Sequence, residues 1–326
     1  MSGFRAYQML VAACRLRIPD LVADGPRSAE DLAAETGTLP GPLLRVLRGL
    51  AVWKVLVETP DGKFGATSLS DTFRSDRPGL RNMTIMLSEE GYQAWGDIMF
   101  TLRTGKSAFE HMYGKSHFDR LGENPELAVH FNAAMVEFSS RVAGAFAAAY
   151  DFTRASTVVD VGGGNGAVLM AVLQAHPRTQ GILFDLAQGL VGAGEKLAAG
   201  GVAERVTLQE GSFFEAVPSD ADVYILKSVI HDWDDERALA ILQTCAHAMR
   251  PTSRLVLLER ALPERIESPD EAFTTVMGDV HMMVVLGGKE RTADEYRDLL
   301  AQAGLRMTSV IPIESDISAF EAVVAG

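Results

Sequence analysis

Three residues of this chain carry the side chains that a proton transfer needs. His231 lies just past the carboxyl end of a predicted strand, in a segment that reads Ile-His-Asp-Trp-Asp-Asp. Glu259 follows the apolar run Leu-Val-Leu-Leu, and Glu290 lies in a glycine turn that reads Gly-Gly-Lys-Glu-Arg-Thr. Histidine is the usual general base near neutral pH, and such a base is normally oriented by a carboxylate.

A single histidine in an apolar run is more often a core residue whose hydrogen bonds are satisfied. The two acids favour the catalytic interpretation, because a buried carboxylate is costly unless it is paired. Either Glu259 or Glu290 can complete a dyad with His231. We expect Glu259, which ends a predicted strand, to fix the tautomer of the imidazole.

A second cluster has the composition of a nucleotide-binding turn. Residues 158–166 read Val-Val-Asp-Val-Gly-Gly-Gly-Asn-Gly, and the apolar segment 167–175 is the predicted following helix. Glycine allows positive φ and a close approach of the backbone to a ligand, and open α/β sheets bind nucleotides at this edge. Asp185 ends the next apolar strand about 20 residues later, where an acid can hydrogen-bond a ribose diol. The two features together predict a cofactor that contains adenosine.

Strands that alternate with helices must position these residues. The predicted strands span 157–161, 180–184, 206–209, 222–226, 254–258, 307–312 and 319–324. This alternation predicts an α/β fold with a doubly wound, mainly parallel sheet. We place the start of this domain at residue 155 and its end at residue 326.

The first 80 residues are predicted to be helical with one β-hairpin. Helices at 28–37 and 40–50 precede two short strands around Asp61-Gly62, which is a typical hairpin turn. The order is that of a winged helix. The second helix offers only Arg45 and Arg48 as cations, so a scaffold or dimer interface is favoured over DNA reading. Residues 81–154 then form a helical linker rich in Met and aromatic residues.

Composition excludes several classes of protein. The 326 residues carry a formal net charge of −13, which argues against non-specific binding of nucleic acid or anionic membrane. The two cysteines, Cys14 and Cys245, are far apart and form no metal or disulfide pattern, so we expect no metal and a reducing compartment. No apolar run reaches the ~18 residues of a membrane span, and the N-terminus lacks the plan of a secretory signal. A cytoplasmic location is therefore expected.

Three motifs occur in an order that resembles one family. Asp-Val-Gly-Gly-Gly-Asn-Gly, His-Asp-Trp-Asp-Asp and Gly-Gly-Lys-Glu-Arg-Thr make the chain similar to the plant caffeic-acid-type O-methyltransferases and their bacterial relatives that methylate natural-product phenols. The resemblance covers essentially the whole chain. It implies a Rossmann-like class I methyltransferase domain behind a winged-helix dimerisation domain. It also implies S-adenosylmethionine as cofactor, S-adenosylhomocysteine as product, a homodimer, a small aromatic substrate, and a place in secondary metabolism such as antibiotic biosynthesis.

The resemblance also implies roles for individual residues. Gly162 would meet the amino-acid end of the cofactor, Asp185 the ribose and Phe214 the adenine, while Ser139 would reach the cofactor from the linker. The residues implied to bind the cofactor are Gly162, Gly164, Asp185, Ser212, Phe213, Phe214, Lys227 and Ser139. Those implied to contact the acceptor are Phe131, Met135, Asp232 and Met282, and those implied in catalysis are His231, Glu259 and Glu290.

The chain departs from the family pattern at three places. Ala187 stands where the family often has proline after the ribose acid, and Ser212 stands where it often has aspartate near the adenine. Ser212 can still hydrogen-bond the adenine amine, but without charge. Leu286 replaces an asparagine that plant members carry ahead of the Gly-Gly pair. We therefore expect a more apolar acceptor pocket than that of an enzyme for lignin precursors.

The expected reaction joins an aromatic hydroxyl to a methyl group aligned in line with it, while His231 takes the proton. Alignment contributes on the order of 7–11 kcal/mol. A phenol of pKa about 10 and a histidine of about 6.5 leave a proton-transfer cost of roughly 4.8 kcal/mol unless an acid stabilises the imidazolium. Two alternatives stay open. One is a relative that keeps the cofactor but acts as a hydroxylase, decarboxylase or cyclase, and the other is a winged-helix regulator that uses the cofactor as an effector.

Overall fold

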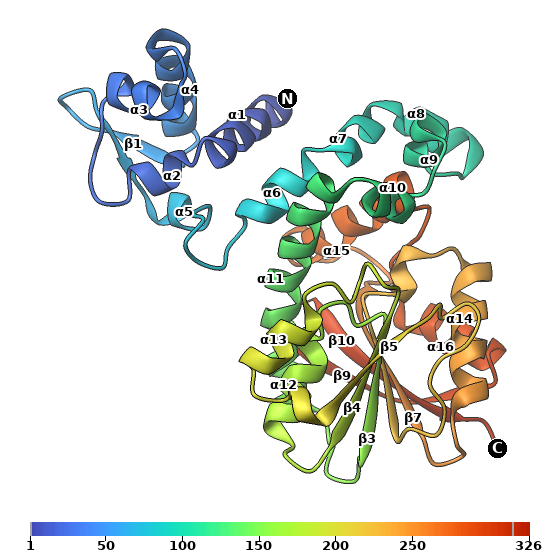
Figure 1. Cartoon of the computed structure of the whole chain (residues 1–326). Helices are drawn as coiled ribbons and strands as arrows, with labels where there is room; N and C mark the ends of the chain where they lie inside the picture. Colours follow the sequence, from blue (N-terminus) through green and yellow to red (C-terminus); the bar gives the residue numbers. More distant parts are fainter. Residues whose placement is uncertain (1, 315) are drawn as a thin grey trace. The chain divides into compact units, whose positions relative to one another are not determined.

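A mixed sheet organises the second half of the chain (Figure 1). Its parallel part has the order β5-β4-β3-β6-β7 and consists of β3 (Thr157–Val161), β4 (Gln180–Asp185), β5 (Val206–Glu210), β6 (Val223–Lys227) and β7 (Arg254–Leu262). β10 (Ile317–Val324) then pairs antiparallel with both β7 and β9 (Leu305–Glu314). The doubly wound α/β fold predicted from the sequence is confirmed.

One predicted boundary is wrong in a way that matters for the site. β7 continues to Leu262 instead of ending before Glu259. The extra length is held on both sides, because β10 pairs with it opposite Glu259 and the short strand β8 (Arg291–Thr292) pairs with its last two residues. Glu259 therefore lies within a strand, where its side chain direction is fixed by the pleat.

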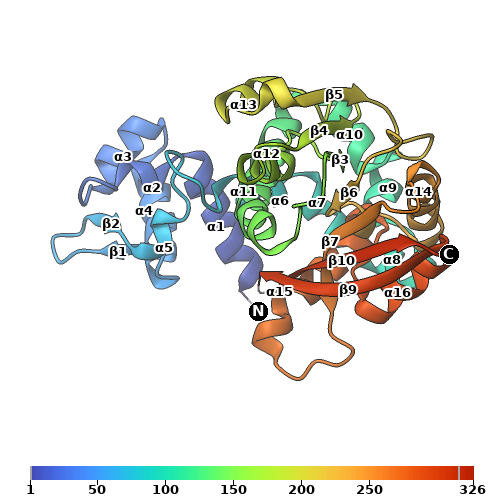
Figure 2. The ribbon, with the colours of Figure 1, turned by 90° about the horizontal axis from the view of Figure 1, so that it is seen from below.

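Helices cover both faces of this sheet (Figures 1 and 2). One layer holds α12 (Ala167–Ala175), α13 (Ala193–Ala199) and the end of α11 (Pro125–Ala149), and the other holds α14 (Asp235–Ala248) and α16 (Ala293–Gln302). Side chains of β6 alternate between the layers: Val223 and Ile225 pack in the first, Tyr224 and Leu226 in the second. Burial on both faces explains why these strands are continuously apolar.

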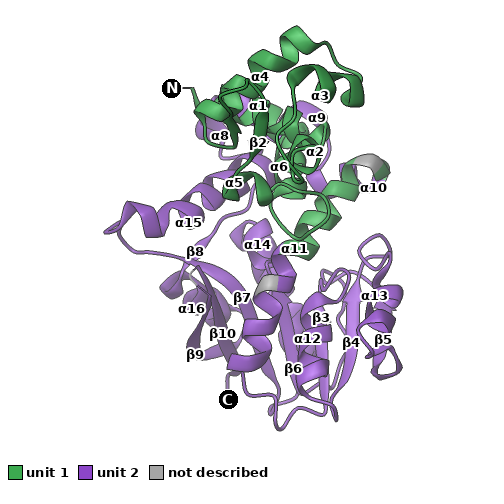
Figure 3. Cartoon of the chain, turned by 90° about the vertical axis from the view of Figure 1, so that its left-hand side faces the viewer, with its two compact units in different colours: residues 1–93, 123–137 green, residues 94–122, 138–326 purple. Residues whose placement is uncertain are grey.

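The computed structural model describes residues 2–314 and 316–326, without the side chains of residues 126 and 141. It forms two units, residues 1–93 with 123–137 and residues 94–122 with 138–326, coloured separately in Figure 3. The helical stretch 81–154 is shared between them. The division into segments 1–80, 81–154 and 155–326 stays a prediction. No helix in the described ranges is long and apolar enough to cross a membrane.

The first unit contains the predicted hairpin, in which β1 (Leu56–Glu58) pairs antiparallel with β2 (Phe64–Ala66). Its helices are α1 (Gly3–Arg15), α2 (Ile18–Leu21), α3 (Ala29–Thr36), α4 (Pro40–Val52), α5 (Ser68–Asp71) and α6 (Arg81–Leu87), followed by α7 (Glu90–Ala94). The second unit adds α8 (Ile98–Thr104), α9 (Ala108–Tyr113), α10 (His117–Glu123), α15 (Pro269–His281), the 3-10 turns η1 (Trp95–Asp97), η2 (Ala203–Arg205) and η3 (Ile230–Asp232), and the π-helix η4 (Met282–Leu286).

The glycine turn after β3 is bound to the next strand by its backbone. The Gly162 N–H donates to the Phe184 carbonyl at 2.8 Å. Gly162, Gly164 and Gly166 all have positive φ, between 56° and 77°, which is the conformation that favours glycine. The turn therefore holds a shape that residues with a side chain would resist.

Gly163→Ala is expected to destabilise the fold. An added methyl would lie 2.5 Å from Leu183 Cδ1 and 2.6 Å from Asp160 Cγ, and relieving such overpacking costs about 1–3 kcal/mol. The midpoint of urea unfolding should fall. Gly194→Ala in α13 is the matched control, because its nearest neighbour would be 3.9 Å away and alanine favours helix. Equal midpoints for the two variants would contradict this account.

Candidate active site

His231 lies in the short 3-10 turn η3, between the carboxyl end of β6 and the start of α14. The turn is reached through Ser228, whose φ of 51° bends the chain sharply. It is followed by α14, whose first turn is capped by Asp234, which accepts from the Arg237 N–H at 2.8 Å. The bend and the cap leave His231 buried at the edge of the sheet, where the sequence predicted it.

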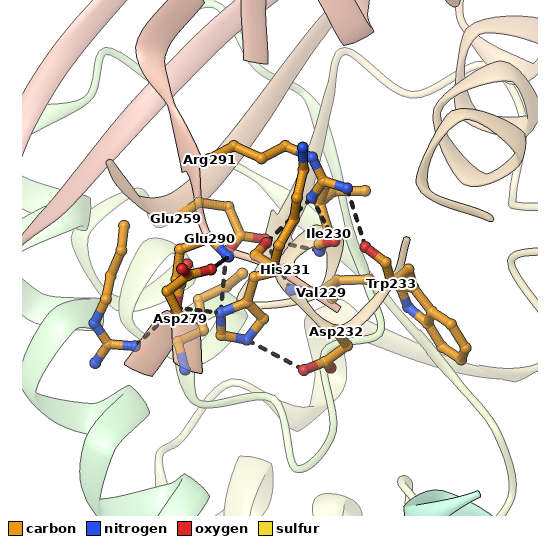
Figure 4. A network of polar contacts seen from close by, with 12 residues as sticks. Val229, Ile230, His231, Asp232, Trp233, Glu259, Asp279, Glu290 and Arg291 are labelled. Atoms are coloured by element: carbon orange, nitrogen blue, oxygen red, sulfur yellow. Dashed lines mark hydrogen bonds and ion pairs between the residues drawn. The ribbon is translucent and has the colours of Figure 1, made fainter. Parts of the chain in front are cut away.

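Three acids surround the imidazole (Figure 4). Nδ1 is hydrogen-bonded to Glu290 Oε1 at 2.9 Å, and Nε2 lies 3.3 Å from Asp232 Oδ1. Glu259 Oε2 lies farther away, 3.8 Å from Nδ1. The expectation that Glu259 fixes the tautomer is therefore wrong: the hydrogen bond to the ring comes from Glu290, which is carried to His231 by the turn before β8.

Glu259 holds the turn instead of the ring. Its Oε1 accepts hydrogen bonds from the backbone N–H groups of Val229 and Ile230, at 2.9 and 2.8 Å. The side chain is completely buried, and its position inside β7 aims it at the start of η3. Glu259 thus fixes the backbone that presents His231 and keeps a carboxylate close to the imidazole.

Glu290 is itself held from several sides. Its N–H donates to Asp279 of α15 at 3.0 Å, and Arg260 of β7 lies 3.6 Å from its Oε1. Two residues earlier the chain passes so close to η3 that a Cβ on Gly288 would lie 2.1 Å from the His231 carbonyl oxygen. Only glycine fits at position 288, and Gly287 before it has a φ of 75°, a conformation that favours glycine.

Arg291 is a residue of the site that sequence analysis missed. Although charged, it is fully buried. It donates to the carbonyls of Ile230 and Trp233, each at 3.0 Å, and binds Asp235 Oδ1 at 2.8 Å. An arginine beside Glu290 in the same motif was the available signal. It fastens the two ends of η3 to β8.

The electrostatics favour a charged imidazole. Burial by itself lowers the pKa of His231, but Glu259, Glu290 and Asp232 outweigh it and raise that pKa to about 9. Burial raises the pKa of Asp232 to about 7 against the opposing effect of His231, and burial likewise raises the pKa of Glu259. The site therefore stabilises a proton on His231, and the ring can accept one from a weak acid only in its neutral form.

The same three residues have a spacing that a metal ion also uses. One ligand atom from each of His231, Glu259 and Glu290 lies within 4.8 Å of the others. Here His231 Nδ1 is bonded to Glu290, and Glu259 Oε1 accepts two peptide N–H groups. These contacts account for the arrangement as a hydrogen-bonded cluster.

The predicted ribose acid meets the glycine turn. Asp185 Oδ2 accepts from the Gly164 N–H at 2.8 Å, and its Oδ1 accepts from Leu186. A Cβ on Gly162 would lie 3.0 Å from Val229 Cγ2 and 3.5 Å from Phe213 Cε1. The loops after β3, β4, β5 and β6 thus converge at one edge of the sheet, as the sequence predicted.

Lys227 and Ser139 are also brought together. Lys227 Nζ donates to Ser139 Oγ at 3.1 Å and lies 4.2 Å from the centre of the Phe138 ring. Burial lowers the pKa of this lysine to about 8. Buried Asp160 of β3 was not singled out from the sequence, although an acid in an apolar strand is a signal: its Oδ1 has no hydrogen-bond partner among the described residues, and burial raises its pKa to about 7.

Three aromatic side chains pack together in the loops after β5 and β6. Trp233, also missed by sequence analysis, packs edge-on against Phe214 and Phe213, with ring centres 4.9 and 6.1 Å away. Phe214 and Trp233 line a pocket of about 720 Å³, together with Glu110, Lys115, Asp119 and Arg237. Ser212 is next to the group, and its Oγ accepts from the Phe214 N–H at 3.3 Å.

The four residues predicted to contact the acceptor lie in different parts of the structure. Asp232 lies against His231, and Met282 begins η4, directly after α15. Phe131 and Met135 belong to the part of α11 in the first unit. The acceptor roles of all four residues stay predictions.

The chain is similar to known proteins over almost its whole length. Residues 95–306 match the O-methyltransferase domain family, and residues 1–76 match the O-methyltransferase dimerisation domain family. The phenazine O-methyltransferase PhzM of Lysobacter antibioticus is 42% identical over 99% of this chain and 94% of its own. The aclacinomycin 10-hydroxylase RdmB of Streptomyces purpurascens is 35% identical, over 96% of this chain and 87% of its own.

A solved structure shows the same likeness in three dimensions. It is the O-methyltransferase NcsB1 from neocarzinostatin biosynthesis, in complex with S-adenosylmethionine and 2-hydroxy-5-methyl naphthoic acid. Its TM-score is 0.87 at 32% identity, over 98% of this chain and 95% of that one.

Two substitutions should separate the roles of the acids. Glu290→Gln removes the charge bonded to Nδ1, so the pKa of His231, followed by NMR titration of its ring, should fall by about one unit or more. Glu259→Gln should in addition lower the free energy of unfolding by roughly 1–3 kcal/mol, because a carboxylate that binds two buried peptide N–H groups is lost.

The raised pKa of His231 predicts how the stability of the folded protein depends on pH. The folded pKa of His231, about 9, is above its ordinary value of 6.5. Its contribution to stability is therefore complete below pH 6.5 and is lost as the pH rises through about 9. Glu290→Gln should flatten that dependence in urea unfolding measured from pH 6 to 9. A ring that titrates near 6.5 in the unaltered protein would contradict the assignment.

Proposed function

Since the chain belongs to the family of S-adenosylmethionine-dependent O-methyltransferases, we propose that it methylates an aromatic hydroxyl of a small natural product, with His231 as the base. The observation that carries the proposal is the 2.9 Å hydrogen bond between His231 Nδ1 and Glu290, at the same sheet edge as the glycine turn. Glu290 orients the ring and leaves Nε2 for the acceptor hydroxyl.

The residues of the sheet edge fit the cofactor. A Cβ on Gly164 would meet nothing within 4 Å, so the glycine turn leaves room for a ligand at that residue. Asp185 would bind the ribose, and Phe213 and Phe214 would contact the adenine, with Ser212 beside them. The unpartnered Oδ1 of Asp160 offers an acceptor for an ammonium group. When bound, S-adenosylmethionine supplies a methyl group on a positively charged sulfur. Lys227 and Ser139 would complete the cradle.

The raised pKa of His231 lowers the cost of the transfer step itself. Proton transfer from a phenol of pKa about 10 to the neutral ring, whose pKa is about 9, costs about 1.4 kcal/mol. At pH 7 the ring is mostly protonated, so it must first release that proton to solvent, at a cost of about 2.7 kcal/mol. His231 Nε2 takes the proton, and Glu290 and Glu259 stabilise the imidazolium that forms. Asp232, which lies 3.3 Å from Nε2, is displaced or protonated when the hydroxyl takes its place.

A hydroxylase is the second candidate, because RdmB is similar over nearly the whole chain. His231, held by Glu290, favours methyl transfer, because the acceptor hydroxyl must lose a proton in that reaction. A decarboxylase or cyclase is disfavoured for the same reason. A winged-helix regulator is disfavoured by the net charge of −13, because DNA binding needs cations that neutralise phosphates.

The first test of the function is turnover. The protein is incubated with S-adenosylmethionine and a panel of phenols and hydroxyquinones, and methoxy product is measured. His231→Ala should lower kcat by about 10²- to 10⁴-fold, and a chelator should leave the rate unchanged. Comparable kcat in the variant would rule out His231 as the base. Oxygenated product without a methoxy group would favour the hydroxylase.

We further propose that the chain acts as a homodimer in the cytoplasm. The match of residues 1–76 to a dimerisation domain supports the first statement. The second rests on Cys14 and Cys245, which are buried free thiols suited to a reducing compartment. Sedimentation equilibrium at micromolar concentration should give twice the 35.2 kDa chain mass. A monomer at that concentration would contradict the first statement.

A further inference from the structure

A second histidine, His281, ends α15 and is not used by the mechanism above. Its ring is held by Trp95 of η1: the indole Nε1–H lies 3.1 Å from His281 Nδ1, and the two rings stack with centres 6.2 Å apart. An indole nitrogen can only donate. Nδ1 must therefore accept, which places the proton of the neutral imidazole on Nε2.

The Nε2–H of His281 is available to a ligand. Among residues 2–314 and 316–326 this N–H has no hydrogen-bond partner, and the His281 side chain is only partly buried. The N–H is therefore not completely enclosed by the protein. Burial lowers the pKa of His281 to about 4, so the ring is an uncharged donor at neutral pH.

His281 lies on the face of α15 that meets the catalytic pair. A Cβ on Gly278 would lie 3.6 Å from Glu290 Oε1, the oxygen bonded to His231. Residues three apart share a helix face, so His281 follows Gly278 along it by about 4.5 Å of helix rise. Asp279, between them, accepts from the Glu290 N–H.

The chain around His281 is fixed in place and apolar. Directly after it, α15 widens into the π-helix η4, a form often found at functional sites. The Ser107 hydroxyl donates to the Val285 carbonyl of η4 at 2.8 Å. Phe109, Val284 and Val285 are buried in one cluster here, with Trp95 packed against it. The donor thus lies beside an apolar cluster, with His117 near enough to lower the pKa of His281 further.

Building on the proposed function, we propose that His281 Nε2–H binds a neutral carbonyl oxygen on the acceptor's ring system. The acceptor class is then a flat aromatic ketone, quinone or lactam that also carries the hydroxyl to be methylated. A neutral donor beside an apolar cluster matches a neutral oxygen. A carboxylate would in addition be repelled by the acids around His231. His281 is in this view a specificity-determining residue, and Trp95 is the positioning residue that fixes its tautomer.

The test uses a matched pair of acceptors, hydroxyfluorenone and hydroxyfluorene, with the hydroxyl at the same ring position. Methyl transfer is measured for kcat and KM, and binding with S-adenosylhomocysteine present is measured by calorimetry. The unaltered protein should favour the ketone roughly tenfold in KM and Kd. His281→Phe should remove that preference by weakening ketone binding roughly tenfold, with kcat little changed.

Two further variants make the result specific. Trp95→Phe keeps an aromatic ring but removes the indole donor, so part of the ketone preference should be lost. His247→Phe, at an exposed position near the end of α14, is the matched control and should keep the full preference. NMR of the ring nitrogens should show the Nε2–H tautomer of His281 at pH 7, and the Nδ1–H tautomer or a charged ring there would overturn the proposal.

The outcomes separate this inference from the proposed function. Methylation of both compounds with a ratio that His281→Phe leaves unchanged would uphold the function and overturn the inference. Ketone binding that depends on His281, without methylation of either compound, would uphold the inference and count against the function. Binding of neither compound would overturn the inference, because the apolar cluster beside His281 would then not accept such rings.

Discussion

The burial of Glu259 and Glu290 beside His231 is the constraint on which the rest of this structure depends. Each buried charge costs several kcal/mol of desolvation unless partners compensate for it. Here the partners are the imidazole itself, two peptide N–H groups and Arg260. Since these partners come from η3, β7 and the turn before β8, the acids can be buried only when the three segments are docked together.

The docking needs backbone contacts that leave no room for side chains. Gly288 lets the turn before β8 lie against the His231 carbonyl, and Arg291 then fastens that turn to both ends of η3. Gly162 makes a similar close contact in the glycine turn, where a Cβ would lie 3.0 Å from Val229 Cγ2. The contact between Gly162 and Val229 lies between β3 and β6, where the strand order reverses. Open α/β sheets bind ligands at such a place.

Several buried polar groups cost stability in the protein without ligand. Asp160 keeps an oxygen without a hydrogen bond, and Lys227 is buried with a lowered pKa. Both lie where a zwitterionic, positively charged cofactor is expected. Binding would then supply the partner that Asp160 Oδ1 lacks and a further one for Lys227, whose ammonium group is already hydrogen-bonded to Ser139. A site that binds the ligand well therefore lowers the stability of the unbound protein. By contrast, His281 is satisfied on one nitrogen only, which leaves its other nitrogen for recognition.

The sequence by itself determined the strand and helix rhythm, the glycine turn with Asp185, and the segment that presents His231. These are local patterns of apolar period and glycine placement, and the family motifs occur within single segments. Only the tertiary structure decided that Glu290, and not Glu259, binds the imidazole, because β7 continues past Glu259 and aims it at the backbone of η3. The contacts of Arg291 and the pairing of Trp95 with His281 were likewise decided there. Trp95 and His281 are 186 residues apart in the chain, and no local pattern specifies which distant segment will supply a partner until the packed layers bring the two together.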